Sequence, residues 1–258
     1  MTPLLHSPDG LEALRRLVSE PSLLAFDFDG TLSPIVADRD AAALAPTTAS
    51  LLREVCRSYR CALITGRSRG DALARTEGIP FEFVIGNHGM EDVPDPRVLD
   101  GGLPFLPIVD ETHAALEVTL GDCDGVTIEN KGLSLAIHYR RALERSRVRE
   151  RLLARLAPLA DRFRVVPGKM VLNLVPVGAA HKGDALAALI RRTGVARALY
   201  VGDDVTDEDV FATPMPAAVT TVRVGTSPAS AARFFLPDQR KMDDLLAMLF
   251  HQKHANEP

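Results

Sequence analysis

Two aspartates close a short apolar segment near the start of the chain, and their spacing suits phosphoryl or metal chemistry. Residues 23–26 are Leu-Leu-Ala-Phe, and Asp27-Phe28-Asp29-Gly30-Thr31 follows directly. Like charges two positions apart repel each other and lose hydration beside a buried strand, so the pair indicates either a cation that compensates them or a phosphate with which they react. On an extended strand both carboxylates share a face, and Gly30 allows the turn that brings them to one small site. The alternative is that both residues only end a strand and cap a turn, which aspartate often does.

The apolar segments along the chain predict the elements that position these residues. Strand-like apolar segments alternate with helical patterns, the strands at residues 23–26, 61–64, 81–85, 198–201 and 218–224 and the helices at residues 10–19, 47–59, 69–76 and 182–192. Continuously apolar strands separated by helices are typical of a parallel sheet that is covered on both faces. We therefore expect an α/β fold with a doubly wound parallel sheet, whose ligands bind beyond the carboxyl ends of the strands.

Polar residues follow four of these strands at the end where a ligand is expected. They are Asp27 and Asp29, Thr65, Asn87 and His88, and Asp203 and Asp204. A single strand end with polar residues has a structural explanation. Four such ends at one edge of the sheet indicate an active site. Five acids lie within residues 203–209, and the later ones suit the start of a helix. Asp203 and Asp204 precede that helix, and Mg²⁺ prefers a few carboxylates together with water and phosphate oxygens.

Lys182 occupies the first turn of the predicted helix 182–192. A cation is unfavourable there because the amino end of a helix carries a partial positive charge, which Asp184 offsets only in part. A bound anion would reverse the sign of this interaction. The alternative is an exposed lysine whose ammonium points away from the helix.

The middle of the chain has a different pattern and predicts a second domain. Residues 93–107 hold four prolines and a Gly-Gly pair, which is typical of a linker or a loose hairpin. From there to residue 176, two pairs of adjacent strands alternate with helices, which predicts a small antiparallel sheet covered on one face. We place the core at residues 1–104 and 177–258 and an inserted α+β cap at residues 105–176, where it can close over the crevice. His138 is explained by the solvated face of a cap strand.

The bulk properties exclude several classes of protein. The 258 residues carry a net charge of −4 and a pI near 6.0, which argues against a nucleic-acid binder. The three cysteines have no CxxC spacing, so neither a disulfide framework nor a zinc site is indicated, and free thiols fit a reducing compartment. Residues 1–10 do not resemble a secretory signal, and no apolar segment has membrane-spanning length. We expect a cytoplasmic protein with no membrane partner, as a monomer or a weak dimer.

Four motifs occur in the order found in the haloacid dehalogenase-like (HAD) phosphatase superfamily, which the chain resembles over nearly its whole length. They are Asp27-Phe28-Asp29-Gly30-Thr31, Thr65-Gly66-Arg67, Lys182, and Gly202-Asp203-Asp204-Val205-Thr206-Asp207. Other segments are similar to trehalose-6-phosphate phosphatases, namely Gly86-Asn87-His88-Gly89-Met90-Glu91, Glu129-Asn130-Lys131-Gly132, Pro167-Gly168-Lys169 and residues 202–208. The inserted domain lies where that family has its cap. The resemblance implies a HAD-like core with a cap and a phosphatase for a small sugar phosphate.

The resemblance also implies a role for each motif residue. Asp27 would be the nucleophile that forms an aspartyl phosphate, and Asp29 would protonate the departing sugar oxygen and then activate water. Thr65 and Lys182 would hold the phosphoryl oxygens. The cofactor would be Mg²⁺. Its ligands would be Asp27, the main-chain carbonyl of Asp29 and Asp203, with Asp204 and Asp207 in support.

Substrate recognition is implied at a second set of residues, from both the core and the cap. They are Arg67, Asn87, His88, Glu129, Lys131, Lys169 and Asn173. Asn173 departs from the family, which usually has a glutamate there; asparagine keeps an acceptor but loses the charge. A phosphatase for another sugar phosphate, of the sucrose phosphate or mannosyl-phosphoglycerate type, therefore stays open. A non-catalytic phospho-receiver or sugar-phosphate sensor is the third reading, and Asp29 argues against it because a sensor needs no second carboxylate.

Overall fold

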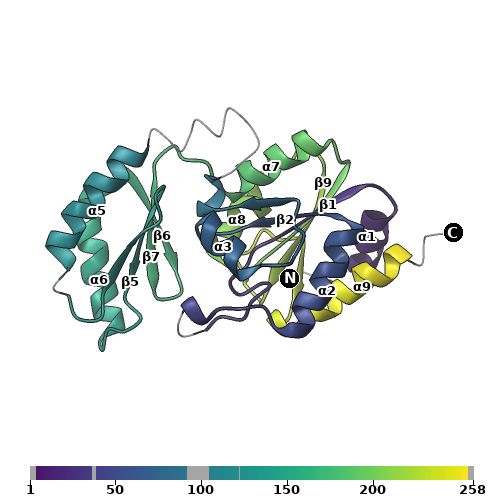
Figure 1. The fold of residues 1–258 in the computed structure, drawn as a ribbon, viewed down its shortest axis with the longest axis horizontal. Coiled ribbons are helices and arrows are strands. Elements are labelled where there is room, and N and C mark those ends of the chain that lie inside the picture. The colour runs from purple at the N-terminus through teal and green to yellow at the C-terminus, as the bar shows by residue number, and fades with distance from the viewer. Residues whose placement is uncertain (1–3, 37–38, 92–104, 122, 255–258) are drawn as a thin grey trace. The chain divides into compact units, whose positions relative to one another are not determined.

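The structure is a computed structural model, and it describes residues 4–36, 39–91, 105–121 and 123–254 (Figure 1). The chain forms two compact units, one from Met1–Asp95 and His181–Pro258, the other from Pro96–Ala180. The predicted boundary at 176/177 lies four residues before the division at 180/181. The predicted boundary at 104/105 adjoins residues 92–104, which lie outside the described residues.

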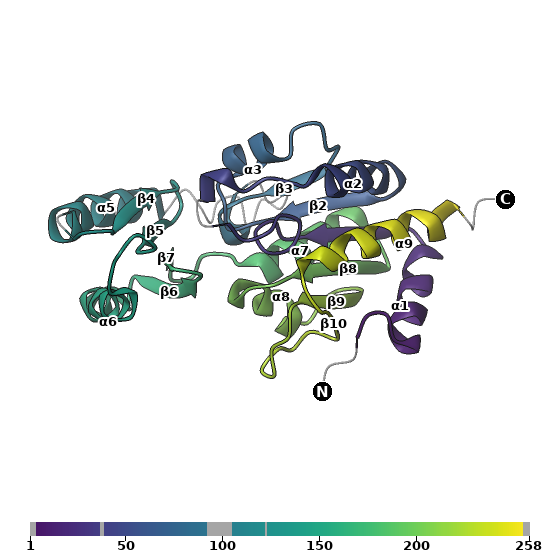
Figure 2. The same cartoon turned by 90° about the horizontal axis from the view of Figure 1, so that it is seen from below.

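A six-stranded sheet forms the centre of the first unit, in the order β10-β9-β8-β1-β2-β3 (Figure 2). Its strands are β1 (Ser22–Phe26), β2 (Arg60–Ile64), β3 (Phe83–Ile85), β8 (Arg197–Gly202), β9 (Ala218–Val224) and β10 (Phe234–Leu236). Every pairing is parallel. In the register, Ala25 of β1 lies opposite Ala62 of β2 on one side and Tyr200 of β8 on the other. Every residue of β1 is buried, which explains the continuous apolar sequence of residues 23–26.

Helices cover both faces of this sheet. They are α1 (Pro8–Val18), α2 (Pro46–Ser58), α3 (Arg69–Arg75), α7 (Lys182–Thr193), α8 (Glu208–Ala212) and α9 (Met242–His254). Helix α9 contacts both α1 and α2, and the apolar residues of the three helices share a core with Leu24, Phe26 and Leu63. Helix α7 packs against β1 and β2 as well. Leu23 and Ala25, which alternate with Leu24 and Phe26, are also fully buried, so the predicted doubly wound sheet is confirmed.

Two elements of the first unit were not predicted from the sequence. Strand β10 has only three residues, too few to produce a recognisable apolar segment. Helix α9 had a usable signal, because Leu245, Leu246 and Leu249 follow helical spacing after two acids and are fully buried. Strand β3 also begins two residues later than expected, at Phe83.

The second unit is a four-stranded antiparallel sheet in the order β4-β5-β7-β6. Its elements are α5 (Leu106–Leu120), β4 (Thr127–Asn130), β5 (Leu135–His138), α6 (Arg145–Leu156), β6 (Phe163–Gly168) and β7 (Val171–Pro176). Both helices lie on the same side of the sheet (Figure 1), where their leucines pack against Leu135, Ile137 and Leu172. Because side chains alternate along a strand, the opposite face carries Ala136 and its neighbours in register, Glu129 and Asn173.

The structure also bears on the cysteines and on the presence of membrane-spanning helices. Cys56, Cys61 and Cys123 are all free thiols. Among the residues that the structure describes, no helix has both the length and the apolar character required to cross a membrane.

Candidate active site

The carboxyl ends of β1 and β8 bring together residues from three distant segments. Asp27 follows β1 and Asp203 follows β8, and the main-chain N–H of Asp27 donates to the carbonyl of Val201 at 2.9 Å. Lys182, in the first turn of α7, places Nζ 2.7 Å from Asp27 Oδ1 and 2.8 Å from Asp207 Oδ1. The lysine side chain is only 2% exposed. The buried ammonium therefore has two anionic partners, which offset its position at the amino end of a helix.

The electrostatics of this cluster are dominated by burial and by an excess of negative charge. Burial raises the pKa of Asp27 well above its ordinary value; the nearby Lys182 opposes this shift, and Asp207 and Asp203 add to it. Burial works against the charge of Lys182, but Asp207 and Asp27 outweigh it and raise the pKa of the ammonium. Three carboxylates face one ammonium, so a further cation would favour the ionised form of Asp27.

Asp207 holds the loop after β8 and is fully buried. Its Oδ1 accepts hydrogen bonds from Lys182 Nζ at 2.8 Å and from Tyr200 Oη at 2.6 Å. Its Oδ2 accepts from the main-chain N–H groups of Asp203 at 2.8 Å and Asp204 at 2.9 Å. A Cβ at Gly202 would lie 2.2 Å from Asp207 Cγ, so glycine is required for this approach. Four hydrogen bonds occupy the carboxylate and leave it little capacity to ligate a cation directly.

Asp27 and Asp203 are the side chains that fit a divalent cation. One carboxylate oxygen from each of Asp27, Asp203 and Asp207 lies within 4.8 Å of the other two. Gly30, with φ at +87°, makes room for this cluster, because a Cβ there would lie 2.1 Å from Asp203 Oδ2. Since Asp207 is occupied by its four donors, the remaining two carboxylates form a hard oxygen site of the kind that Mg²⁺ prefers.

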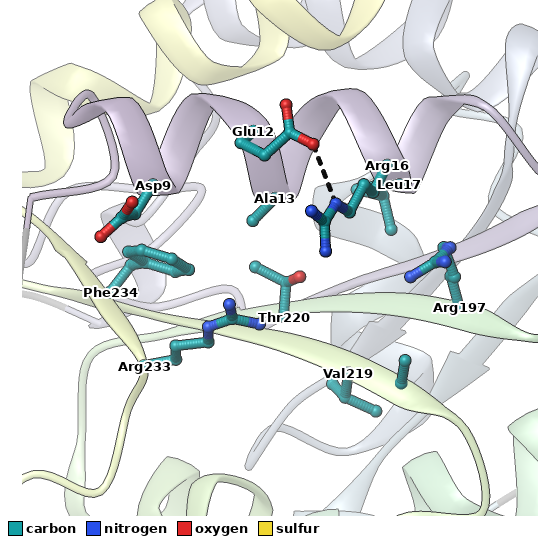
Figure 3. A pocket seen from close by; sticks show the side chains of 11 residues that line it. Asp9, Glu12, Ala13, Arg16, Leu17, Arg197, Val219, Thr220, Arg233 and Phe234 are labelled. Carbon is teal, nitrogen blue, oxygen red and sulfur yellow. Dashed lines mark hydrogen bonds and ion pairs between the residues drawn. The ribbon is translucent and has the colours of Figure 1, made fainter.

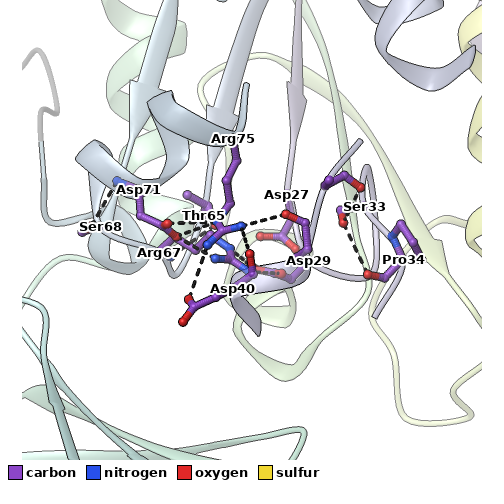
Figure 4. Close-up of polar contacts among 12 residues, drawn as sticks. Asp27, Asp29, Ser33, Pro34, Asp40, Thr65, Arg67, Ser68, Asp71 and Arg75 are labelled. Atoms are coloured by element: carbon purple, nitrogen blue, oxygen red, sulfur yellow. Dashed lines mark hydrogen bonds and ion pairs between the residues drawn. The ribbon is translucent and has the colours of Figure 1, made fainter. Parts of the chain in front are cut away.

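Asp29 forms a bidentate ion pair with Arg67 (Figure 4). The guanidinium donates from Nε to Asp29 Oδ2 and from Nη2 to Asp29 Oδ1, both at 2.6 Å. A third donor, Nη1, reaches Asp71 Oδ2 at 2.6 Å, and the guanidinium carbon lies 5.3 Å from the ring centre of Phe28. Burial works against the charge of Arg67, but hydrogen bonds and charge from Asp29 and then Asp71 outweigh it and raise the pKa of Arg67.

The loop after β3 joins the loop after β2 at the same edge of the sheet. The main-chain N–H of Asn87 donates to the carbonyl of Arg67 at 2.7 Å, and that of His88 donates to the carbonyl of Thr65 at 2.9 Å. Asn87 and His88 have φ values of +48° and +60°, a costly conformation for side chains other than glycine that is often found at functional sites. A Cβ at Gly66 would lie 2.4 Å from His88 Cε1, so the imidazole lies against that glycine. Thr65 is 1% exposed.

The second unit gathers its predicted residues on the sheet face opposite the helices. Glu129 Oε2 lies 2.9 Å from His138 Nε2, and Lys131 Nζ donates to Asn173 Oδ1 at 3.2 Å. Lys169 is exposed and begins the turn between β6 and β7. The structure thus brings Glu129, Lys131 and Asn173 together, with Lys169 at the end of the neighbouring hairpin.

Three residues that contact the predicted site were missed by sequence reasoning. Tyr200 donates to Asp207 but lies within an apolar strand, where it has the appearance of a core residue. Asp71 follows Arg67 by four positions, and that helical spacing was a usable signal. Arg223 of β9 donates from Nη2 to the carbonyl of Asp203 at 2.6 Å, and only the pairing of β9 with β8 places it there.

A cavity of about 400 Å³ lies elsewhere in the first unit (Figure 3). It is lined by Asp9, Glu12 and Arg16 of α1 and by residues that include Arg197 and Ala218, the first residues of β8 and β9. Because parallel strands all begin at the same edge, this cavity is at the opposite end of the sheet from Asp27 and Asp203. None of the predicted site residues lines it.

Solved structures of phosphatases have the same fold. The C-terminal domain of a Candida albicans trehalose-6-phosphate phosphatase matches with a TM-score of 0.78 and 22% identity, over 97% of this chain and 99% of that one. A phosphatase of the HAD superfamily from Bacteroides thetaiotaomicron matches with a TM-score of 0.56 and 15% identity, over 90% of this chain and 95% of the other. At these identities the likeness concerns the fold, which is that of the HAD phosphatases.

The sequence gives the narrower assignment. A model of the trehalose-phosphatase family matches residues 25–240, and the chain therefore belongs to the trehalose-phosphatase family. A trehalose-phosphate phosphatase of Mycobacterium tuberculosis is 35% identical over an alignment of 260 positions that covers 95% of this chain. The chain spans 66% of the length of that relative. The family resemblance predicted from the motifs is confirmed.

Proposed function

We propose that the protein is a Mg²⁺-dependent phosphohydrolase that converts trehalose 6-phosphate to trehalose and phosphate through an aspartyl phosphate on Asp27. The observation that carries the proposal is the Lys182 ammonium, which lies 2.7 Å from Asp27 Oδ1 beyond the end of β1. A buried carboxylate beside a buried cation is suited to accept a phosphoryl group. Membership of the trehalose-phosphatase family supports the choice of sugar.

In the first step, an oxygen of Asp27 attacks phosphorus. The new Oδ–P bond forms as the bond between phosphorus and the sugar oxygen breaks, and the electron pair goes to the sugar oxygen. Asp29 donates a proton to that oxygen, which leaves as a hydroxyl. Lys182 and Thr65 hold the oxygens of the phosphoryl group, where the ammonium balances charge that develops during transfer.

In the second step, water releases the phosphate. Asp29 is now ionised and takes a proton from the water that attacks phosphorus, and the bond to Asp27 breaks with its electrons returning to the carboxylate. Asp29 thereby regains the proton that it gave to the sugar. Asp207 keeps Lys182 in place through both steps by means of its 2.8 Å hydrogen bond.

The residues present fit a Mg²⁺ ion. Asp27 and Asp203 would hold it together with the main-chain carbonyl of Asp29, while Asp204 and Asp207 orient the loop that carries Asp203. When bound, the ion supplies positive charge that lets an anionic carboxylate approach an anionic phosphate.

The proposal assigns the sugar to polar residues of both units. In the first unit these are Asn87 and His88, held at the carboxyl edge of the sheet. In the second unit they are Glu129, Lys131, Lys169 and Asn173. Carboxylate and amide oxygens accept from sugar hydroxyls, and lysines donate to them.

A panel of phosphate esters tests this proposal. Purified protein is mixed with trehalose 6-phosphate, sucrose 6-phosphate, mannosyl-phosphoglycerate and glucose 6-phosphate, with Mg²⁺ or with EDTA, and released phosphate is measured. We expect the largest kcat/KM with trehalose 6-phosphate and loss of turnover in EDTA. Equal or greater kcat/KM with another ester would reject trehalose 6-phosphate as the substrate.

A second candidate function is the hydrolysis of another sugar phosphate, and Asn173 is the observation that favours it. Asn173 accepts a hydrogen bond from Lys131, at a position where the family resemblance implies a glutamate. The neutral amide offers sugar hydroxyls a weaker acceptor than a carboxylate. The same panel separates the two functions, because its second and third esters represent the alternative.

A further inference from the structure

The contacts of Arg67 distinguish it from a residue that binds substrate. Its side chain is 3% exposed, whereas the Asp29 side chain that it pairs with is 42% exposed. Two of its donors are held by Asp29 and a third by Asp71. The guanidinium therefore lies beneath the carboxylate, and Asp29 presents itself to a ligand while Arg67 does not.

A series of ion pairs fixes Arg67 in this position. Asp71 accepts from Arg67 Nη1 and also from Arg75 Nε at 2.9 Å. Arg75 in turn donates from Nη1 to the carbonyl of Ala42 at 2.8 Å. A planar guanidinium with Asp71 as a fixed acceptor and the Phe28 ring beside it has little rotational freedom. It can impose its own orientation on the more exposed carboxylate.

We propose that Arg67 is a positioning residue for Asp29, which it holds in the orientation that proton exchange with the sugar oxygen and with water requires. This inference rests on the proposed function and deepens it. Both oxygens of Asp29 are held at 2.6 Å, so one must leave its donor to transfer a proton while the other stays bound. Arg67 thus keeps one oxygen of Asp29 bound while the other oxygen gives up or accepts the proton.

The proposal replaces the sequence-based role of Arg67 as a substrate contact. A substrate contact contributes to binding, and its loss raises KM. A positioning residue acts through the group that it orients, and its loss lowers kcat. The two roles also differ when Asp29 is removed, because a positioning effect then has nothing left to act on.

A double-mutant cycle tests the inference. Arg67→Met, Asp29→Ala and the double variant are assayed with Mg²⁺ and with trehalose 6-phosphate, or with the ester of the panel that shows the largest kcat/KM. We expect Arg67→Met to lower kcat by roughly 10- to 100-fold with KM within about 2-fold, since general acid-base catalysis contributes about 10²- to 10⁴-fold. In the Asp29→Ala background we expect no further loss.

A matched control and a second variant separate this effect from damage to the fold. Arg60 also forms a bidentate pair, with Glu82 at 2.8 and 2.5 Å, but it begins β2 at the opposite end of the sheet. Arg60→Met should leave kcat unchanged. Asp71→Asn loosens Arg67 without removing it and should lower kcat less than Arg67→Met, again only when Asp29 is present. If Arg67→Met does not fold, as judged by circular dichroism, the cycle of Asp71→Asn with Asp29→Ala decides.

Several outcomes would overturn the inference. A rise in KM at constant kcat would make Arg67 a substrate contact. An equal loss of kcat in the presence and absence of Asp29 would show that Arg67 acts independently of that carboxylate. Failure of the proposed function would appear earlier, as no phosphate release by the unmodified protein, and would overturn this inference too. A failed cycle in an active enzyme overturns this inference alone.

Discussion

The Lys182 ammonium lies 2.7 Å from Asp27 Oδ1, across 155 positions of sequence. The lysine is 2% exposed and the aspartate side chain 6% exposed, so water stabilises neither charge well. Each residue depends on the other, and Lys182 depends also on Asp207. Removal of the ammonium would leave buried carboxylates without their cation.

We expect Lys182→Met to impair both stability and turnover. Loss of one partner of a buried ion pair costs about 3–5 kcal/mol, and the phosphoryl oxygens lose the ammonium that would hold them. Urea unfolding and phosphate release measure the two effects. Lys241 is an exposed lysine that pairs with Asp244, and Lys241→Met should change stability by less than about 0.5 kcal/mol. Near-normal turnover of Lys182→Met would contradict the assigned role.

Asp27→Asn should fold normally and release no phosphate. An amide is a poor nucleophile, and loss of a nucleophile lowers kcat on the order of 10⁴-fold or more. Asparagine has nearly the same shape and keeps an acceptor for Lys182. Single-turnover assays at high enzyme concentration measure the residual rate, and circular dichroism checks the fold. An active Asp27→Asn protein would exclude the nucleophile assignment.

Divalent cations should stabilise the protein in a manner that depends on Asp27. The native fold raises the pKa of this carboxyl well above its ordinary value. The protonated form of Asp27 therefore contributes to the free energy of unfolding at pH values below the ordinary aspartate pKa. This contribution is lost as pH rises through the raised pKa. At neutral pH, Mg²⁺ that binds only the native state should raise the unfolding temperature. Differential scanning calorimetry should show a smaller increase for Asp27→Asn, and an equal increase would place the ion elsewhere.

Gly30→Ala should abolish turnover and destabilise the protein. A Cβ there would lie 2.1 Å from Asp203 Oδ2, in a backbone conformation with φ at +87°. Gly78 is a matched control because its φ is +75° and nothing lies within 4 Å of its Cβ position. Gly78→Ala should show only the backbone strain, about 1–2 kcal/mol, with normal kcat. Equal kcat values for the two variants would show that the Asp203 carboxylate does not need its present position.

Asn173→Glu tests whether the departure from the family pattern affects sugar recognition. The introduced carboxylate accepts stronger hydrogen bonds from sugar hydroxyls and pairs with Lys131, so we expect KM for trehalose 6-phosphate to fall by roughly 3- to 10-fold at similar kcat. Asn130→Glu, in the same sheet, is the control, because Asn130 donates instead to Asp110 of α5. An unchanged KM would remove Asn173 from the sugar contacts.

Much of the fold could be predicted because strands that are buried on both faces of a sheet have continuously apolar sequences. Residues 23–26 are all buried, and all four are apolar. Helix α9 was not predicted, although its leucines follow helical spacing in the sequence. The three-residue β10 gave no pattern at all.

Some residues of the candidate site could also be predicted from the sequence, and others could not. Asp27 and Asp203 could be predicted as neighbours because the ends of adjacent parallel strands must meet. Arg67 was found by motif, but its ion pairs with Asp29 and Asp71 were not predicted. Tyr200 could not be found, because a tyrosine within an apolar strand gives no sign that its hydroxyl reaches a carboxylate.

The pairing of β1 with β8 has a consequence for how the molecule acquires activity. Ser22 lies opposite Arg197 in this register, so the pair closes a loop that encloses the whole second unit. Closure of so long a loop has a large entropic cost and makes such parallel pairing slow. During refolding from denaturant, recovery of helical circular dichroism should precede recovery of phosphate release. Helices form from local contacts, whereas hydrolysis requires the pairing of β1 with β8.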